Sequence, residues 1–173
     1  MKKIKISIIA ILGLLVFACS SPLEDAKKNI SSLEESLFSD EMKMIDKQKA
    51  DDLISAYEIF ATDFPEDKQS ADFLFKAGDM AMNLNKPNEA ISLFNRILSE
   101  YPDFNKVPQC VFLKAYIYEN SLNDLGKAKI IYEEFLKRFP DDEFADDAEV
   151  SLKNLGKSPE ELIKEFEAKR AAE

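Results

Sequence analysis

The chain has 173 residues, no histidine, four glycines and a formal net charge of -10 at pH 7. Because histidine is absent, the chain lacks Ser-His and Cys-His nucleophile pairs and imidazole metal ligands, which excludes most hydrolase mechanisms. The glycines are too scattered for a phosphate-binding loop, and the acidic charge opposes binding to nucleic acid. We therefore expect no cofactor, no metal, no small-molecule substrate and no nucleic-acid partner.

The first 18 residues are predicted to be a secretion signal. Lysines precede an apolar run over residues 6–18, which is shorter than the roughly 20 residues that span a bilayer. Residues 15–19 read LVFAC and resemble the lipobox of bacterial lipoproteins, which implies that Cys19 is acylated and becomes the first residue. Ser20 then implies sorting to the outer membrane, with a lipid anchor at its periplasmic face. The alternative is an ordinary signal peptide with an incidental cysteine.

The length that remains after removal of the signal is typical of one domain. A domain of that size buries enough surface to fold without a disulfide. Cys110 is the remaining thiol, and we expect it to lie in the core rather than to react.

The first predicted helix of the mature chain, over residues 23–38, carries apolar residues at spacings of three and four. The stripe is either a heptad seam through which copies self-associate as a structural envelope lipoprotein, or a core face that packs on the next helix. We favour the core face, and we expect residues 39–49 to form the loop between the two helices. The stripe consists of Leu23, Ala26, Ile30, Leu33 and Leu37.

Three segments share one pattern of apolar residues before a proline, which predicts three repeated units. Within each segment the apolar residues at i, i+3 and i+7 lie on one side of a helix, and the proline ends that helix. Small residues four positions before the second and third segments allow two helices to approach closely. The segments run from Tyr57 to Pro65, Phe94 to Pro102 and Tyr132 to Pro140, and the small residues are Ala90 and Ala128.

The second and third units resemble the tetratricopeptide repeat, a helix pair with a 34-residue frame. The first unit is degenerate and keeps only Leu53, Tyr57, Phe60 and Pro65 of its second helix. The resemblance implies an all-α, tetratricopeptide-like solenoid of antiparallel helix pairs with a C-terminal capping helix. The signature positions are filled by Leu74, Ala77, Gly78, Ala81, Ala90, Phe94, Ile97 and Pro102, and in the next unit by Ala115, Tyr118, Ala128, Tyr132 and Pro140.

Prolines and caps complete the predicted layout. Pro22, Pro108 and Pro159 are placed at helix starts, and Pro87 marks a turn over residues 85–88. Ser158 and Glu161 form a capping box before a final helix, whose apolar side would close the solenoid. The predicted segments are the signal peptide 1–18, the lipidated cysteine and tether 19–22, the degenerate helix pair 23–65, repeats 66–104 and 105–140, and a C-terminal pair or cap 141–170, in which Leu162, Ile163 and Phe166 share one side.

The densest candidates for catalysis or calcium binding are clusters of acids at 51–52, 141–143 and 146–147. Calcium loops need carboxylates spaced around a glycine, and that pattern is absent. Acids at helix starts interact favourably with the helix dipole, which explains the clusters without chemistry. The sequence therefore predicts a protein that is not an enzyme.

Together with the lipobox, the layout resembles the periplasmic tetratricopeptide lipoproteins of the bacterial envelope, such as the BamD-like and CpoB-like families. The resemblance implies a membrane-anchored adaptor in outer-membrane protein or envelope assembly. Its concave surface would be lined by the first helix of each pair and would take a segment of another protein. The concave positions are Asp72, Phe75, Asp79, Met82 and Asn83, then Gln109, Phe112, Tyr116, Glu119 and Asn120.

Tetratricopeptide domains that clamp C-terminal carboxylates place Lys, Asn and Arg at several of these positions, whereas this chain has aromatic and acidic residues there. The difference favours a partner segment that carries apolar anchors flanked by Lys or Arg. The alternative for Phe75 and Phe112 is that they pack between neighbouring helices.

Overall fold

The computed structural model describes residues 21–39 and 46–170, and within these ranges the chain is helical with no strand. The predicted signal peptide and Cys19 lie outside the described residues, as does most of the predicted loop 39–49. The helices are α1 Pro22–Phe38, α2 Lys47–Asp63, α3 Ser70–Asn83, α4 Pro87–Glu100, α5 Val107–Asn120, α6 Leu125–Arg138, α7 Ala145–Asn154 and α8 Pro159–Arg170.

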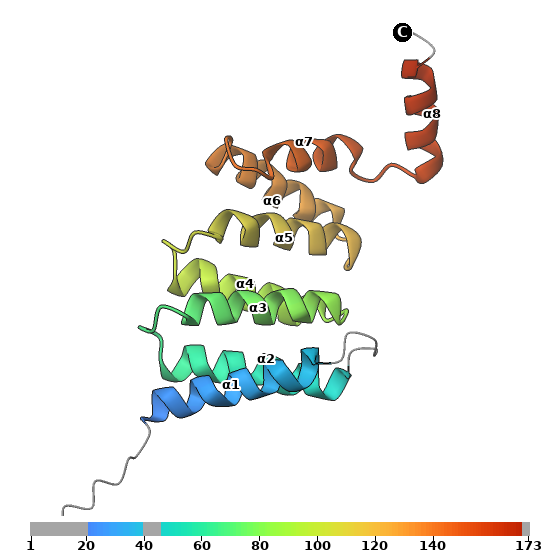
Figure 1. The fold of residues 1–173 in the computed structure, drawn as a ribbon. Helices are drawn as coiled ribbons and strands as arrows, with labels where there is room; N and C mark the ends of the chain where they lie inside the picture. Colours follow the sequence, from blue (N-terminus) through green and yellow to red (C-terminus); the bar gives the residue numbers. More distant parts are fainter. Residues whose placement is uncertain (1–20, 40–45, 171–173) are drawn as a thin grey trace, which may run out of the picture.

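The helices stack as antiparallel pairs in two layers. The first helices α1, α3, α5 and α7 form one layer, and α2, α4 and α6 form the other (Figure 1). Each of the helices from α2 to α6 packs on the helix before it and on the helix after it. The predicted all-α solenoid is confirmed.

Each closing proline follows a helix that has just ended. The residues after α2, α4 and α6 are Phe64, Tyr101 and Phe139, and their backbone angles are nearly identical, with φ from -129° to -134° and ψ from 54° to 58°. Proline cannot donate a hydrogen bond and clashes with the preceding turn, so the same geometry recurs in all three units.

The turn before α4 is tighter than predicted. Pro87 is the first residue of α4 and not part of a turn, because the left-handed residue that reverses the chain comes earlier, at Asn85 with φ 58°. The same role falls to Asn123, with φ 51°, before α6. Asn tolerates this conformation better than most residues, which lets the helix begin directly afterwards.

α2 also begins earlier than expected, at Lys47 instead of after residue 49. Its start is fixed by the Asp46 side chain, which accepts hydrogen bonds from the backbone N–H groups of Gln48 and Lys49. As a result Asp51 lies beyond the first turn, so the dipole explanation for the acids at 51–52 is wrong. Asp51 instead pairs with Lys86 Nζ at 2.7 Å and links α2 to the start of α4.

The stripe on α1 packs against α2, as the second interpretation predicted. Ile30 is 2% exposed, and the other four residues of the stripe lie against the same core. The Tyr57 hydroxyl donates to Glu34 Oε1 at 2.6 Å and ties the two helices together. The apolar side of α1 is thus used within the first helix pair.

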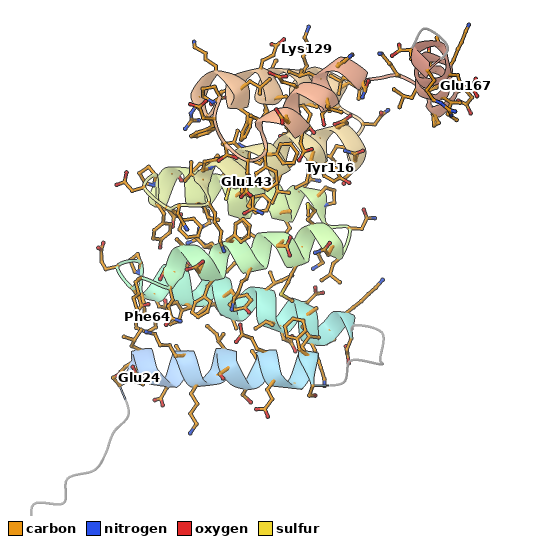
Figure 2. The ribbon with its side chains drawn as sticks, turned by 45° about the horizontal axis from the view of Figure 1, so that its top comes forward. Glu24, Phe64, Tyr116, Lys129, Glu143 and Glu167 are labelled. Atoms are coloured by element: carbon orange, nitrogen blue, oxygen red, sulfur yellow. The ribbon has the colours of Figure 1, made fainter. Side chains whose placement is uncertain are left out.

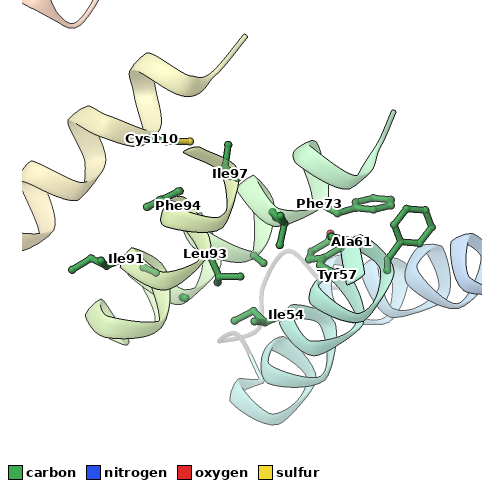
Figure 3. Packing of buried hydrophobic residues seen from close by; sticks show 14 of the residues in the cluster. Ile54, Tyr57, Ala61, Phe73, Ile91, Leu93, Phe94, Ile97 and Cys110 are labelled. Carbon is green, nitrogen blue, oxygen red and sulfur yellow. The ribbon is translucent and has the colours of Figure 1, made fainter. Parts of the chain in front are cut away.

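The core is built around the aromatic residue that repeats once per unit. Tyr57, Phe94 and Tyr132 are each at most 1% exposed. Ala90 and Ala128 are fully buried, as expected where helices approach closely. The helices also approach closely at Gly78, where an added Cβ would lie 2.7 Å from Cε1 of Phe94. Figure 3 shows the Phe94 side of this core, with Ile97 and Cys110 nearby.

α8 begins as predicted but does not cover the end of the solenoid. The Ser158 backbone N–H donates to Glu161 Oε2 at 2.8 Å, and the Glu161 N–H donates to Ser158 Oγ at 3.2 Å, which confirms the capping box. The helix nevertheless projects away from the stack (Figure 1). Leu162 is 36% and Ile163 59% exposed. The reason is local, because Gly156 has φ 79° and turns the chain outward after α7.

Candidate protein-binding face

The ten positions predicted to face a partner lie on α3 and α5, the first helices of the two central pairs (Figure 1). We call them together the inner face. Its α3 residues are Asp72, Phe75, Asp79, Met82 and Asn83, and its α5 residues are Gln109, Phe112, Tyr116, Glu119 and Asn120.

One part of the inner face is covered by Lys106, which comes from the turn before α5. Its Nζ lies 3.3 Å from Asp72 Oδ1 and 4.5 Å from the centroid of the Phe75 ring. Phe75 is half-buried, and its ring centroid lies 6.0 Å from that of Phe94. Asp72 and Phe75 are therefore engaged within the chain. The sequence prediction did not include Lys106, which lies 34 residues after Asp72 in the turn before α5.

Phe112 belongs to the core, which supports the alternative that it packs between helices. It is 8% exposed, and its ring stacks on Phe144 with the centroids 4.9 Å apart. The rings of Tyr132 and Phe135 of α6 also contact it, with centroids 5.8 and 5.9 Å from that of Phe112. Phe112 therefore joins α5 to α6 and to the start of α7, and it is not available to a partner.

The remaining residues of the inner face are half-buried or exposed. Tyr116 is 44% exposed and is labelled in Figure 2. Asn120 Nδ2 donates to the Tyr116 carbonyl at 3.1 Å, and Asn83 Nδ2 donates to Asp79 Oδ2 at 3.3 Å. These contacts hold the amide side chains next to Tyr116 and Asp79 on the surface, where they can hydrogen-bond to a ligand backbone.

The Glu119 side chain is held in place by Tyr132, a core residue of the same helix pair. The Tyr132 hydroxyl donates to Glu119 Oε2 at 2.9 Å, which repeats the contact between Tyr57 and Glu34 in the first unit. Burial raises the pKa of Tyr132, and the carboxylate of Glu119 raises it further, so the hydroxyl stays protonated and donates. The Glu119 carboxylate is thereby fixed in position at the inner face.

The negative charges of the inner face are only partly neutralised. Lys106 pairs with Asp72 at 3.3 Å. Asp79 and Glu119, by contrast, form no ion pair with any residue that the structure describes. The accessible part of the inner face therefore presents the ring of Tyr116 together with two carboxylates, Asp79 and Glu119, that have no basic partner among the described residues.

Residues 72–103 and 109–142 match the family model of the tetratricopeptide repeat. They correspond to α3 with α4 and to α5 with α6, the pairs that the sequence assigned to this family. No curated protein matches the sequence.

Tetratricopeptide repeats mediate protein–protein interaction, and their stacked helix pairs form an extended concave binding surface. The inner face lies on the helices that line this surface in the repeat. Binding of another protein is therefore the role that the matched repeats imply.

No group of three or more Cys, Asp or Glu residues within the described part of the chain is arranged to hold a metal ion. None of the described helices has the length and apolarity that crossing a bilayer requires. Cys110 is fully buried, and burial raises the pKa of its thiol to about 12, so it packs as a core residue, as predicted.

Proposed function

We propose that this chain is a lipid-anchored adaptor at the periplasmic face of the outer membrane, where it binds a protein segment during outer-membrane protein or envelope assembly. The lipobox pattern of residues 15–19 supports the anchor and the compartment. The two tetratricopeptide repeats support the adaptor role, since binding and not catalysis is what such repeats supply.

The observation that carries the partner assignment is that exposed Tyr116 shares the inner face with the carboxylates of Asp79 and Glu119, which form no ion pair with any described residue. A half-exposed aromatic ring gains most from an apolar side chain packed against it. The carboxylates favour Lys or Arg at the ends of such a segment and oppose a ligand that presents its own C-terminal carboxylate. The partner segment therefore carries an apolar anchor with basic flanks.

Selection of peptides from a random library on the immobilised full chain tests this chemistry. We expect enriched peptides to place an aromatic or aliphatic residue between Lys or Arg residues. Tyr116→Ala is expected to weaken their binding about tenfold and to leave the thermal unfolding unchanged, because the ring is 44% exposed. The matched control is Ile130→Ala on α6, which is 65% exposed in the other layer and should leave binding unchanged.

Charge adds a second readout to the same experiment. Asp79→Lys should weaken peptide binding more at low salt than at high salt, because salt screens the exchanged charge. Enrichment of acidic peptides, or a loss of binding caused by Ile130→Ala and not by Tyr116→Ala, would place the binding site elsewhere.

The anchor is tested separately at Cys19. Since the thiol accepts the acyl group, Cys19→Ala should abolish palmitate labelling and release the protein from the detergent phase. Cys110→Ala is the control, because the buried thiol of Cys110 should make no difference to labelling. Labelling that persists in the Cys19→Ala variant would rule out the lipoprotein assignment.

A further inference from the structure

The N-terminal end of the solenoid carries an apolar groove where α1 lies beside α2. The groove has a volume of about 280 Å³ and includes Ala26 and Leu33 of α1 and Ala56 and Ile59 of α2. Ile59 is 60% exposed. The terminal unit of a solenoid normally turns a polar side outward, because no further unit covers it. This unit turns apolar side chains outward instead.

The groove is also acidic. It continues past Phe64 and Asp63 into a second hollow that includes Leu23 and Glu66. No Lys or Arg lines either hollow, and among the described residues Asp63 and Glu66 form no ion pair. An apolar segment with a positive charge near one end would therefore fit this groove better than a neutral or acidic one.

The opposite end of the same molecule presents such a segment. Leu162 and Ile163 are exposed on α8, and Arg170 follows Ile163 by seven residues, which returns it to the same side of the helix. Although the whole chain is strongly acidic, residues 151–170 contain five basic and four acidic side chains. α8 and the α1–α2 pair lie at opposite ends of the stack (Figure 1), so α8 cannot reach the groove of its own chain.

We propose that α8 of one molecule docks in the α1–α2 groove of a second copy, so that copies of this chain join end to end. The docked helix takes the place of a preceding repeat, with Leu162 and Ile163 between Leu33 and Ile59. Arg170 lies at the end of the groove, near Asp63 and Glu66. The two contacting surfaces differ, so the interface is heterologous and allows more than two copies to associate. This surface is distinct from the inner face, and it shares Ala26 and Leu33 with the stripe of α1 that packs on α2.

Photo-crosslinking between two differently tagged full-length copies in cell envelopes tests the proposal. A benzophenone amino acid in place of Ile163 should crosslink to α1 or α2 of the other copy. The same probe at Lys164, which is turned away from Leu162 and Ile163, is the matched control and should give far less product. Ile59→Asp in the receiving copy should lower the yield from position 163 about tenfold, since it puts a carboxylate into the apolar groove.

Reversing the charges at Asp63 and Arg170 gives a second test of the same contact. Asp63→Lys alone should lower the crosslink yield, and the addition of Arg170→Glu should restore it. The proposal is overturned if position 163 crosslinks only to α7 of its own chain, to lipid or to a different protein, if no crosslink forms, or if the exchange restores nothing. Because Tyr116 is remote from both ends, peptide capture at the inner face is measured independently of this result.

Discussion

Replacing Phe94 with Ala is expected to lower the free energy of unfolding by about 3 to 5 kcal/mol. The ring is fully buried between α3 and α4 and lies against the backbone of α3 at Gly78. Because Gly78 has no side chain to move into the space, the cavity left by truncation cannot be filled from that side. We therefore expect the loss to fall in the upper part of this range, as measured by urea unfolding followed by circular dichroism.

Phe94→Leu is the control for this prediction. It keeps most of the apolar volume and should cost no more than about 1.5 kcal/mol. A loss below about 1 kcal/mol for Phe94→Ala would contradict the packing of this ring against Gly78.

Tyr132→Ala is expected to lower the free energy of unfolding by a similar amount, about 3 to 5 kcal/mol, but to destabilise a different part of the chain. The ring is fully buried and contacts Phe112, while its hydroxyl holds Glu119. Since units of a solenoid are stabilised mainly by their neighbours, α5 to α7 should open first. Hydrogen exchange should accelerate in these helices more than in α1 to α3.

Tyr132→Phe separates the hydroxyl from the ring. It removes the hydrogen bond to Glu119 and keeps the aromatic packing, so the expected loss is about 1 kcal/mol. Uniform acceleration of exchange along the whole chain in Tyr132→Ala would mean that the solenoid unfolds as one unit.

Much of the fold follows from residues whose structural effect is local. Pro65, Pro102 and Pro140 end helices wherever they occur, and the spacing of Tyr57, Phe94 and Tyr132 before them marks the buried side of each closing helix. The capping box at Ser158 is also a short-range contact. These features were predicted correctly because each depends on a few neighbouring residues.

The features that the sequence did not predict depend on contacts between residues distant in the chain, or on single residues at caps and turns. The start of α2 is set by the Asp46 side chain, which caps the helix and is not part of its apolar pattern. The outward course of α8 depends on the left-handed Gly156, although the apolar pattern of the helix suggested a packed cap.

The candidate site also combines features that the sequence predicted with features set by contacts between distant residues. The repeat frame placed Phe112 and Tyr116 on the inner-face side of α5, but it does not say which distant residue covers each one. Phe144, just before α7, covers Phe112 and leaves Tyr116 exposed. Lys106 similarly covers Phe75. Contacts between units therefore decide which of the predicted residues remain available to a partner.

Site-specific crosslinking in cell envelopes tests most directly whether the inner face binds a protein. A benzophenone amino acid is placed at Tyr116 in one variant and at Ile130, in the other layer, in the second. We expect the probe at 116 to crosslink to a protein segment that mass spectrometry maps to apolar residues beside Lys or Arg, and the probe at 130 to give no such product. Crosslinking from 130 and not from 116, or to a segment without basic residues, would contradict the assignment of the inner face as the binding surface.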